Sequence, residues 1–184
     1  MAFYLLIAVI VLLLVFLLKT YNGLISMRNS LHNAWSDIDV QLSRRHDLVP
    51  NLVESVKGYM THERQTLEAV TAARSAAMQT SGDIVSRGVA EMALGNAVGN
   101  LFAKSENYPE LKASQNFILL QEQITSTENR IAFARQHYNE TVRQFNTKIA
   151  EFPSNLIAGA FSFQPEKLFA MDAGERANVA LKMS

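Results

Sequence analysis

The sequence lacks cysteine entirely, and its 184 residues include only eight glycines and four prolines. Without cysteine the chain has no disulfide, no thiolate ligand for zinc and no cysteine nucleophile. It also lacks an excess of charge of one sign, because 17 Lys and Arg balance 17 Asp and Glu. Nucleic-acid binding rests on a basic excess that neutralises phosphates, so this balance argues against a nucleic-acid partner.

One long apolar run is present, and it lies at the N-terminus. Residues 2–18 carry no charged side chain, and a helix of this length covers about 25 Å, at the short end of what spans a bilayer. Lys19 and Tyr21 follow it and suit the headgroup region. We therefore expect residues 1–18 to be a transmembrane anchor. The alternative is a cleaved signal peptide, but no charged side chain precedes the run and no small-residue cleavage pattern follows it.

The charges that flank the anchor predict its orientation. Lys19 and Arg28 follow the apolar run, whereas only the terminal amine precedes it. Positive charge favours the cytoplasmic side of the membrane. We expect a single-pass protein of the bacterial inner membrane, with the lipid bilayer as a partner and the C-terminal part in the cytoplasm.

After the anchor, the apolar residues recur at alternating steps of three and four, which is typical of helices in bundles and coiled coils. The first stripe consists of Leu24, Leu31, Trp35, Ile38, Leu42, Val49, Val53, Val56, Met60, Leu67 and Val70. Its phase does not change across Pro50, so the pattern predicts one long helix to about Met78, bent near His46–Pro50. Two helices joined by a tight turn at the proline are the alternative.

Two further helices are predicted between chain breaks. Gly82 and Asp83 suit a left-handed turn and a helix cap, and the next helix, over residues 84–104, would bury Val85, Val89, Met92, Val98 and Phe102. A break at residues 106–109 precedes a last long helix, residues 109–152, which ends at Phe152-Pro153. Its stripe comprises Phe117, Leu120, Ile124, Ile131, Ala134, Tyr138, Val142, Phe145, Ile149 and Phe152.

These patterns predict an all-α fold. It consists of an N-terminal transmembrane helix followed by an elongated antiparallel helical bundle, or coiled-coil-like domain, of three to four long helices. We divide the chain into an anchor (1–18), a helical bundle (19–153) and an aromatic-rich C-terminal tail (154–184). The tail caps the end of the bundle, or it contacts a bilayer or a neighbouring copy.

Several motifs in the expected order resemble the LemA family, over residues 21–153. They include Tyr21-Asn22, Ala34-Trp35, the run IDVQLSRRHDLVPNLV at residues 38–53, Val56-Lys57-Gly58-Tyr59, His62-Glu63, Tyr108-Pro109, Asn116-Phe117, Glu128-Asn129-Arg130-Ile131-Ala132, Ala134-Arg135, Tyr138-Asn139 and Phe152-Pro153. The resemblance implies a bacterial membrane-anchored protein with a helical-bundle soluble part and no established catalytic activity. Relatives are associated with envelope maintenance and, in one specialised branch, with membrane remodelling.

The most distinctive polar cluster surrounds Pro50. Arg45 lies on the apolar stripe, seven residues after Ile38, and a guanidinium there requires a carboxylate partner, because an unpaired buried charge is costly. The cluster is therefore either an ion network that fixes the register of one bundle or a surface for recognition and assembly. Gly88, Gly95 and Gly99 share one helix face and indicate close packing, within the bundle or between copies.

We predict that ten residues mediate interaction or assembly: Trp35, Asp39, Arg44, Arg45, Asp47, Pro50, Asn51, Gly88, Gly95 and Gly99. We predict no catalytic residues, no metal site and no cofactor. In His46-Asp47 and His62-Glu63 the acid adjoins the histidine, whereas helical metal ligands lie about four residues apart.

Together these observations predict a membrane-anchored, non-enzymatic helical scaffold. It would form a homo-oligomer and organise, maintain or remodel the bacterial membrane or envelope. The alternative is an adaptor for a membrane-bound protease or another envelope quality-control protein, which would bind the same cluster around Pro50. A metal-dependent hydrolase and a sensor are further alternatives, but a sensor usually carries a second membrane span, and a second apolar run of that length is absent from the sequence.

Overall fold

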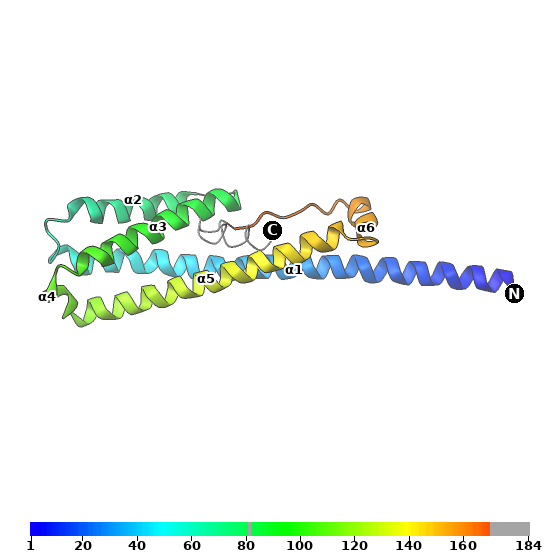
Figure 1. The fold of residues 1–184 in the computed structure, drawn as a ribbon, viewed down its shortest axis with the longest axis horizontal. Coiled ribbons are helices and arrows are strands. Elements are labelled where there is room, and N and C mark those ends of the chain that lie inside the picture. Colours follow the sequence, from blue (N-terminus) through cyan, green and yellow to red (C-terminus); the bar gives the residue numbers. More distant parts are fainter. Residues whose placement is uncertain (81, 170–184) are drawn as a thin grey trace, which may run out of the picture. The chain divides into compact units, whose positions relative to one another are not determined.

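The computed structural model describes residues 1–80 and 82–169, and throughout these residues the regular secondary structure is helical (Figure 1). The predicted all-α class is therefore confirmed. The helices are α1 (Ala2–Lys57), α2 (Arg64–Gln79), α3 (Ile84–Ser105), α4 (Pro109–Lys112), α5 (Gln115–Ala150) and α6 (Ser154–Ala160).

Helix α1 continues through Pro50, as the phase of its apolar stripe predicted. Two expectations about helix ends were wrong. The first helix ends at Lys57, not near Met78, and a turn over residues 58–63 leads into α2. The last helix is divided into α4 and α5 by residues 113–114, and α5 ends at Ala150.

The break between α2 and α3 lies where the sequence placed it. Gly82 has a φ of 104°, in the left-handed region that favours glycine. The Asp83 side chain caps α3 by accepting a hydrogen bond from the Ser86 amide, with an N···O distance of 3.2 Å.

The predicted stripe of α3 is correct at Val98, which is buried, and wrong at Val85 and Val89, which are exposed. The buried face of this helix consists of Gly88, Glu91, Leu94, Val98, Leu101 and Ser105. The error has a physical cause. A glycine, a glutamate and a serine occupy the core-facing side, so hydrophobicity alone points to the neighbouring side.

The described chain divides into two compact units, each with its own packing. Unit 2 comprises residues 37–135 and, at its C-terminal end, the described residues 168–169. Within it α2 packs against α3, and the core is a cluster of mostly aliphatic side chains: Val49, Leu52, Val56, Met60, Val70, Ala77, Leu94, Val98, Leu101, Leu111, Phe117 and Ile124.

Unit 1 comprises residues 1–36 and 136–167. Leu24 of α1 packs with Ile157 and Ala158 of α6, and Tyr21 and Phe163 border this cluster. The segment after α6 is held along α5 by hydrogen bonds, because the Tyr138 hydroxyl donates to the Lys167 carbonyl at 3.0 Å. Residues 161–167 of the predicted tail therefore pack within unit 1, whereas residues 170–184 lie outside the described residues.

The apolar start of α1 is exposed along its whole length. Every residue from 2 to 18 is exposed, and the segment meets the length and composition of a membrane-crossing helix, with a mean hydropathy of 2.9. Such an exposed apolar run is stabilised only when it is buried against lipid or other apolar groups.

Candidate functional site

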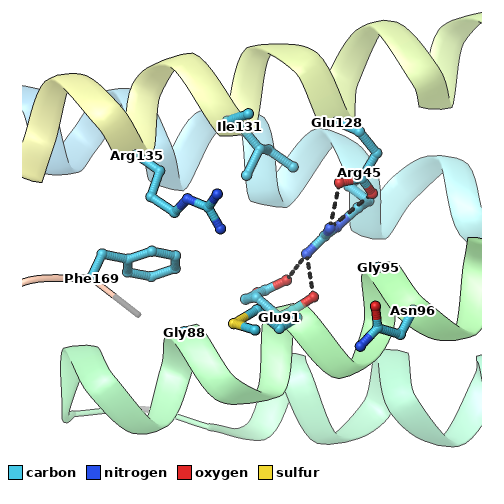
Figure 2. A pocket seen from close by; sticks show the side chains of 11 residues that line it. Arg45, Gly88, Glu91, Gly95, Asn96, Glu128, Ile131, Arg135 and Phe169 are labelled. Carbon is cyan, nitrogen blue, oxygen red and sulfur yellow. Dashed lines mark hydrogen bonds and ion pairs between the residues drawn. The ribbon is translucent and has the colours of Figure 1, made fainter. Parts of the chain in front are cut away.

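Arg45 lies at the centre of a buried ion network in unit 2 (Figure 2). Its side chain is almost fully buried and points from α1 between α3 and α5. The guanidinium forms an ion pair with the Glu91 carboxylate of α3 and donates to the Glu91 carbonyl at 3.0 Å. Its Nη1 also donates to both carboxylate oxygens of Glu128 on α5, at 2.8 and 2.9 Å. The carboxylate partner that the sequence required is thus supplied by two helices.

His46 completes the network on the other side of Glu91. Its Nε2 lies 3.0 Å from Oε1 of Glu91. Burial by itself raises the pKa of Glu91, but the hydrogen bond to His46 and the charge of Arg45 outweigh that effect and hold the pKa below its usual value of 4.5. Glu91 is therefore ionised at neutral pH, and its charge is neutralised inside the bundle.

A second arginine compensates for the proline in α1. Pro50 has no amide hydrogen, so the carbonyl of His46, four residues earlier, loses its helical donor. Arg74 of α2 replaces that donor, because its Nε donates to the His46 carbonyl oxygen at 2.8 Å. This contact explains how α1 accommodates Pro50 in the bundle.

A cavity of about 300 Å³ adjoins the network. Figure 2 shows Arg135 and Phe169 at one end of it and Arg45 at the other. Gly95 borders the guanidinium, since a Cβ added there would lie 3.5 Å from Nη1 of Arg45. That separation is an ordinary van der Waals contact, so a Cβ at this position would fit beside the guanidinium without displacing it.

The arrangement is suited to fixing helix register rather than to catalysis. Acid–base or hydrolytic chemistry needs a carboxylate that is free to reach a substrate, whereas Glu91 and Glu128 are both engaged by Arg45. In the part of the chain that the structure describes, no group of three or more His, Asp or Glu side chains is placed to hold a metal ion. The network links α1, α3 and α5 in one arrangement, which is the best-attested use of buried charges.

The predicted interaction residues fall into three groups. Arg45, Gly88 and Gly95 line the cavity. Asp39 forms an ion pair with Arg87 of α3, and Trp35 packs edge-on against Tyr138 within unit 1, with ring centroids 5.5 Å apart. The others are exposed, namely Arg44, Asp47, Pro50, Asn51 and Gly99.

Four of the predicted interaction residues are exposed on α1, and we call them the α1 strip: Arg44, Asp47, Pro50 and Asn51. Arg44, Asp47 and Asn51 follow one another at steps of three and four, so they lie on one side of the helix. Neither Arg44 nor Asp47 forms an ion pair with any residue the structure describes. The polar cluster of the sequence is thus two features, a buried network and an exposed strip.

Sequence reasoning did not name Glu91 and Glu128 as the partners of Arg45. It also did not name Arg74 as the donor to the His46 carbonyl. Glu91 carried a usable signal, because it lies three residues after Gly88 and three before Leu94, on the buried face of α3. Glu128 carried a weaker one, since it lies four residues after Ile124 and three before Ile131, which both belong to the predicted stripe of the last helix. Arg74 could have been found by asking which donor replaces the missing amide of Pro50.

The LemA family model matches residues 34–183 of the chain. Protein LemA of Metamycoplasma hominis is 28% identical over 158 residues, which cover 86% of this chain and 72% of that protein. Magnetosome protein MamQ of Magnetospirillum gryphiswaldense is 25% identical and Magnetosome protein MamQ 2 of Paramagnetospirillum magneticum is 24% identical, each over 178 residues and 83% of this chain.

The chain spans 65% of the length of these two magnetosome proteins, which is less than two thirds. The residues that the family model matches, 34–183, include the whole ion network and the α1 strip. The helical architecture, the motifs between residues 21 and 153 and the family match agree. This chain belongs to the LemA family.

Proposed function

We propose that this protein is a non-enzymatic scaffold, anchored in the bacterial inner membrane by residues 2–18, that self-associates and organises or remodels the membrane. The single observation that carries the proposal is the continuity of α1. The same helix provides the exposed apolar run and, further along, the buried face of unit 2. An apolar run in the same helix that contributes to a bundle core is a covalent membrane anchor for the chain.

The composition of α1 supports the anchor and its orientation. The apolar run of about 25 Å is slightly shorter than the hydrocarbon layer of about 30 Å, and Lys19 and Tyr21 extend its reach into the headgroups. Lys19 and Arg28 favour a cytoplasmic location for the rest of the chain.

The internal pairing of the charges in unit 2 supports a structural role. Arg45 engages both nearby carboxylates, and none of the matched relatives is named for a catalytic activity. Of the relatives described above, one is named Protein LemA and two are named as magnetosome proteins. A non-enzymatic scaffold at a membrane is consistent with these names.

The α1 strip supports self-association. Arg44 and Asp47 are exposed charges of opposite sign, three residues apart on one helix. Two copies can pack with their α1 helices parallel, related by a two-fold axis that runs parallel to both helices. Arg44 of each copy can then reach Asp47 of the other, because the two residues lie about 4.5 Å apart along the helix axis. Two such ion pairs would form in every interface between copies.

Light scattering of the full-length protein in a mild detergent tests self-association. We expect a protein mass of two or more copies of the 20.5 kDa chain. Arg44→Asp should shift the particle towards one copy, because both ion pairs become repulsive. The charge-swapped variant Arg44→Asp/Asp47→Arg is the matched control, since it preserves complementarity and should restore the mass.

Two results would contradict this proposal. A single copy for the unmodified protein, together with an absence of crosslinks between copies in cells, would exclude the scaffold. If the oligomer persists in both variants while a second protein is lost from the purified complex only in Arg44→Asp, the α1 strip binds that partner. The adaptor function would then replace self-association through this strip.

A further inference from the structure

Three large apolar side chains are exposed in α6 and in the turns directly before and after it. Phe152, Leu156 and Phe161 have exposed fractions of 79%, 64% and 60%. They belong to unit 1, whose neighbouring aromatic residues are packed, so their exposure is local and specific. We call these three side chains the apolar foot.

The backbone after α6 fixes the outward direction of Phe161. The Phe163 amide donates to the Ala158 carbonyl at 2.9 Å, and the Ser162 amide donates to the Gly159 carbonyl at 3.2 Å. This pair of bonds is the Schellman motif, which requires a left-handed residue between the bonded segments. Ser162 supplies it with a φ of 55°, a conformation uncommon for a residue other than glycine. The turn separates an exposed Phe161 from a packed Phe163.

Contacts within unit 1 place the foot close to the end of the anchor. The Phe161 ring lies against Tyr21, with centroids 4.7 Å apart, and α6 packs on Leu24. Tyr21 follows the last residue of the apolar run by three positions, or about 4.5 Å along the helix. The headgroup layer on each side of a bilayer is about 5–8 Å deep. Phe161 is therefore at headgroup level when residues 2–18 span the membrane.

The chemistry of the foot fits this layer. Aromatic side chains are enriched where hydrocarbon meets headgroups. The charged neighbours Lys148 and Glu151 face each other at 3.4 Å and offset each other's charge. The apolar run is also about 5 Å shorter than the hydrocarbon layer, and such a mismatch draws the flanking residues towards the lipid.

We propose that the apolar foot is a second membrane contact, which inserts Phe152, Leu156 and Phe161 into the interfacial layer of the bilayer that holds the anchor. This inference rests on the membrane anchoring proposed above. A single helix can turn about its own axis in the membrane, whereas interfacial anchors fix its tilt and rotation. The foot thereby sets which side of α1 each copy presents to its neighbours.

Tryptophan fluorescence in vesicles containing brominated lipid tests the contact. The full-length protein has one tryptophan, Trp35, so we begin from Trp35→Phe, which keeps an aromatic ring against Tyr138. We then add Phe161→Trp as the probe. The control is His32→Trp, at an exposed position of α1 that lies fourteen residues, or about 21 Å, beyond the apolar run.

Brominated phosphatidylcholine should remove most of the emission of the Phe161→Trp probe and little from the His32→Trp control. The emission maximum of the probe should also lie at a shorter wavelength for the protein in vesicles than for the unfolded protein without detergent. Phe152→Trp provides a second probe, in case one substitution disturbs the fold, and it should behave like Phe161→Trp. Because the contact is apolar, added salt should leave the quenching unchanged.

Flotation of the same vesicles separates the failure of this inference from the failure of the anchor. If the protein does not float with vesicles, both the anchor and the foot are overturned. If it floats but neither probe is quenched by brominated lipid, the foot alone is overturned, and protection of the probes from aqueous acrylamide would assign them to a second copy. Equal quenching of probe and control would also overturn the foot, because the body would then lie flat on the membrane.

Discussion

The two units differ in the side chains that hold them together. Unit 1 is built on aromatic contacts, such as Phe163 against Phe145 at 6.3 Å between ring centroids and Arg28 at 5.3 Å from the Phe163 ring centroid. Unit 2 combines an aliphatic core with the buried network around Arg45. Aromatic side chains bury a large apolar area and tolerate several ring orientations, whereas a buried ion pair is favourable only in one geometry. The stability of unit 2 therefore depends on the register of its helices, and the stability of unit 1 depends on the apolar area that is buried.

Removal of Arg45 should have the largest effect. In Arg45→Met, Glu91 remains buried and loses its main partner, which costs about 3–5 kcal/mol of unfolding free energy. Urea unfolding of the full-length protein in detergent, followed by circular dichroism, measures the loss. The double variant Arg45→Met/Glu91→Met is the control, because it removes both buried charges and should be more stable than the single variant. Equal losses in the two variants would contradict a network that depends on pairing.

The arginine that compensates for the proline should have a smaller effect. Arg74→Met leaves the His46 carbonyl without a donor, and a hydrogen bond from a charged group contributes about 1.5–3 kcal/mol. In the Pro50→Ala background the residue-50 amide can donate to that carbonyl, so the same substitution should cost less. The double-mutant cycle measures the coupling, and a coupling of zero would show that Arg74 does not replace the missing amide.

Much of this architecture follows from the sequence, and the errors have physical causes. The stripe of α1 is local, so its passage through Pro50 was predictable. The turn after Lys57 was missed because Val56, Glu63 and Val70 keep the seven-residue spacing across it, and Glu63 makes no side-chain cap at the start of α2. Gly58 directly follows Lys57, and a glycine after a basic last turn is typical of a helix end, but the continuous phase of the stripe was given more weight than this signal.

The candidate site was predictable only in part, because its partners are distant in sequence. The position of Arg45 on an apolar stripe showed that it needs a carboxylate. The identity of that carboxylate depends on tertiary packing, since Glu91 is 46 residues away and Glu128 is 83 residues away. The position of Glu91 on the face of α3 that carries Gly88 and Leu94 makes it a candidate, but spacing along the sequence does not show which helix packs against Arg45.

Acid should weaken unit 2 through Glu91. The folded pKa of Glu91 lies below its ordinary value of 4.5, so its contribution to stability is present above that pH and is lost as the pH falls through the folded pKa. The difference in unfolding free energy between the unmodified protein and Glu91→Gln should be constant near neutral pH and shrink below pH 4.5. A difference that is independent of pH would contradict an ionised Glu91.

Alkali should weaken unit 1 through Tyr138, and this effect should be the smallest. Burial, together with the charge of Glu166, raises the pKa of Tyr138 from 10 to about 12. The contribution of Tyr138 to the free energy of unfolding is therefore fully present below pH 10 and is lost as the pH rises towards 12. Tyr138→Phe should cost about 0.5–1.5 kcal/mol at neutral pH through the hydrogen bond to Lys167. The deficit should narrow between pH 10 and 12 in unfolding experiments, and a constant deficit would contradict this assignment.

Extraction of bacterial membranes with alkaline carbonate, followed by a mass measurement of the chain left in the membrane, tests whether residues 2–18 are a retained anchor. We expect the protein to stay in the membrane pellet with residues 2–18 still part of it. Release of the chain into the supernatant, or loss of this segment from it, would show that residues 2–18 do not anchor the protein.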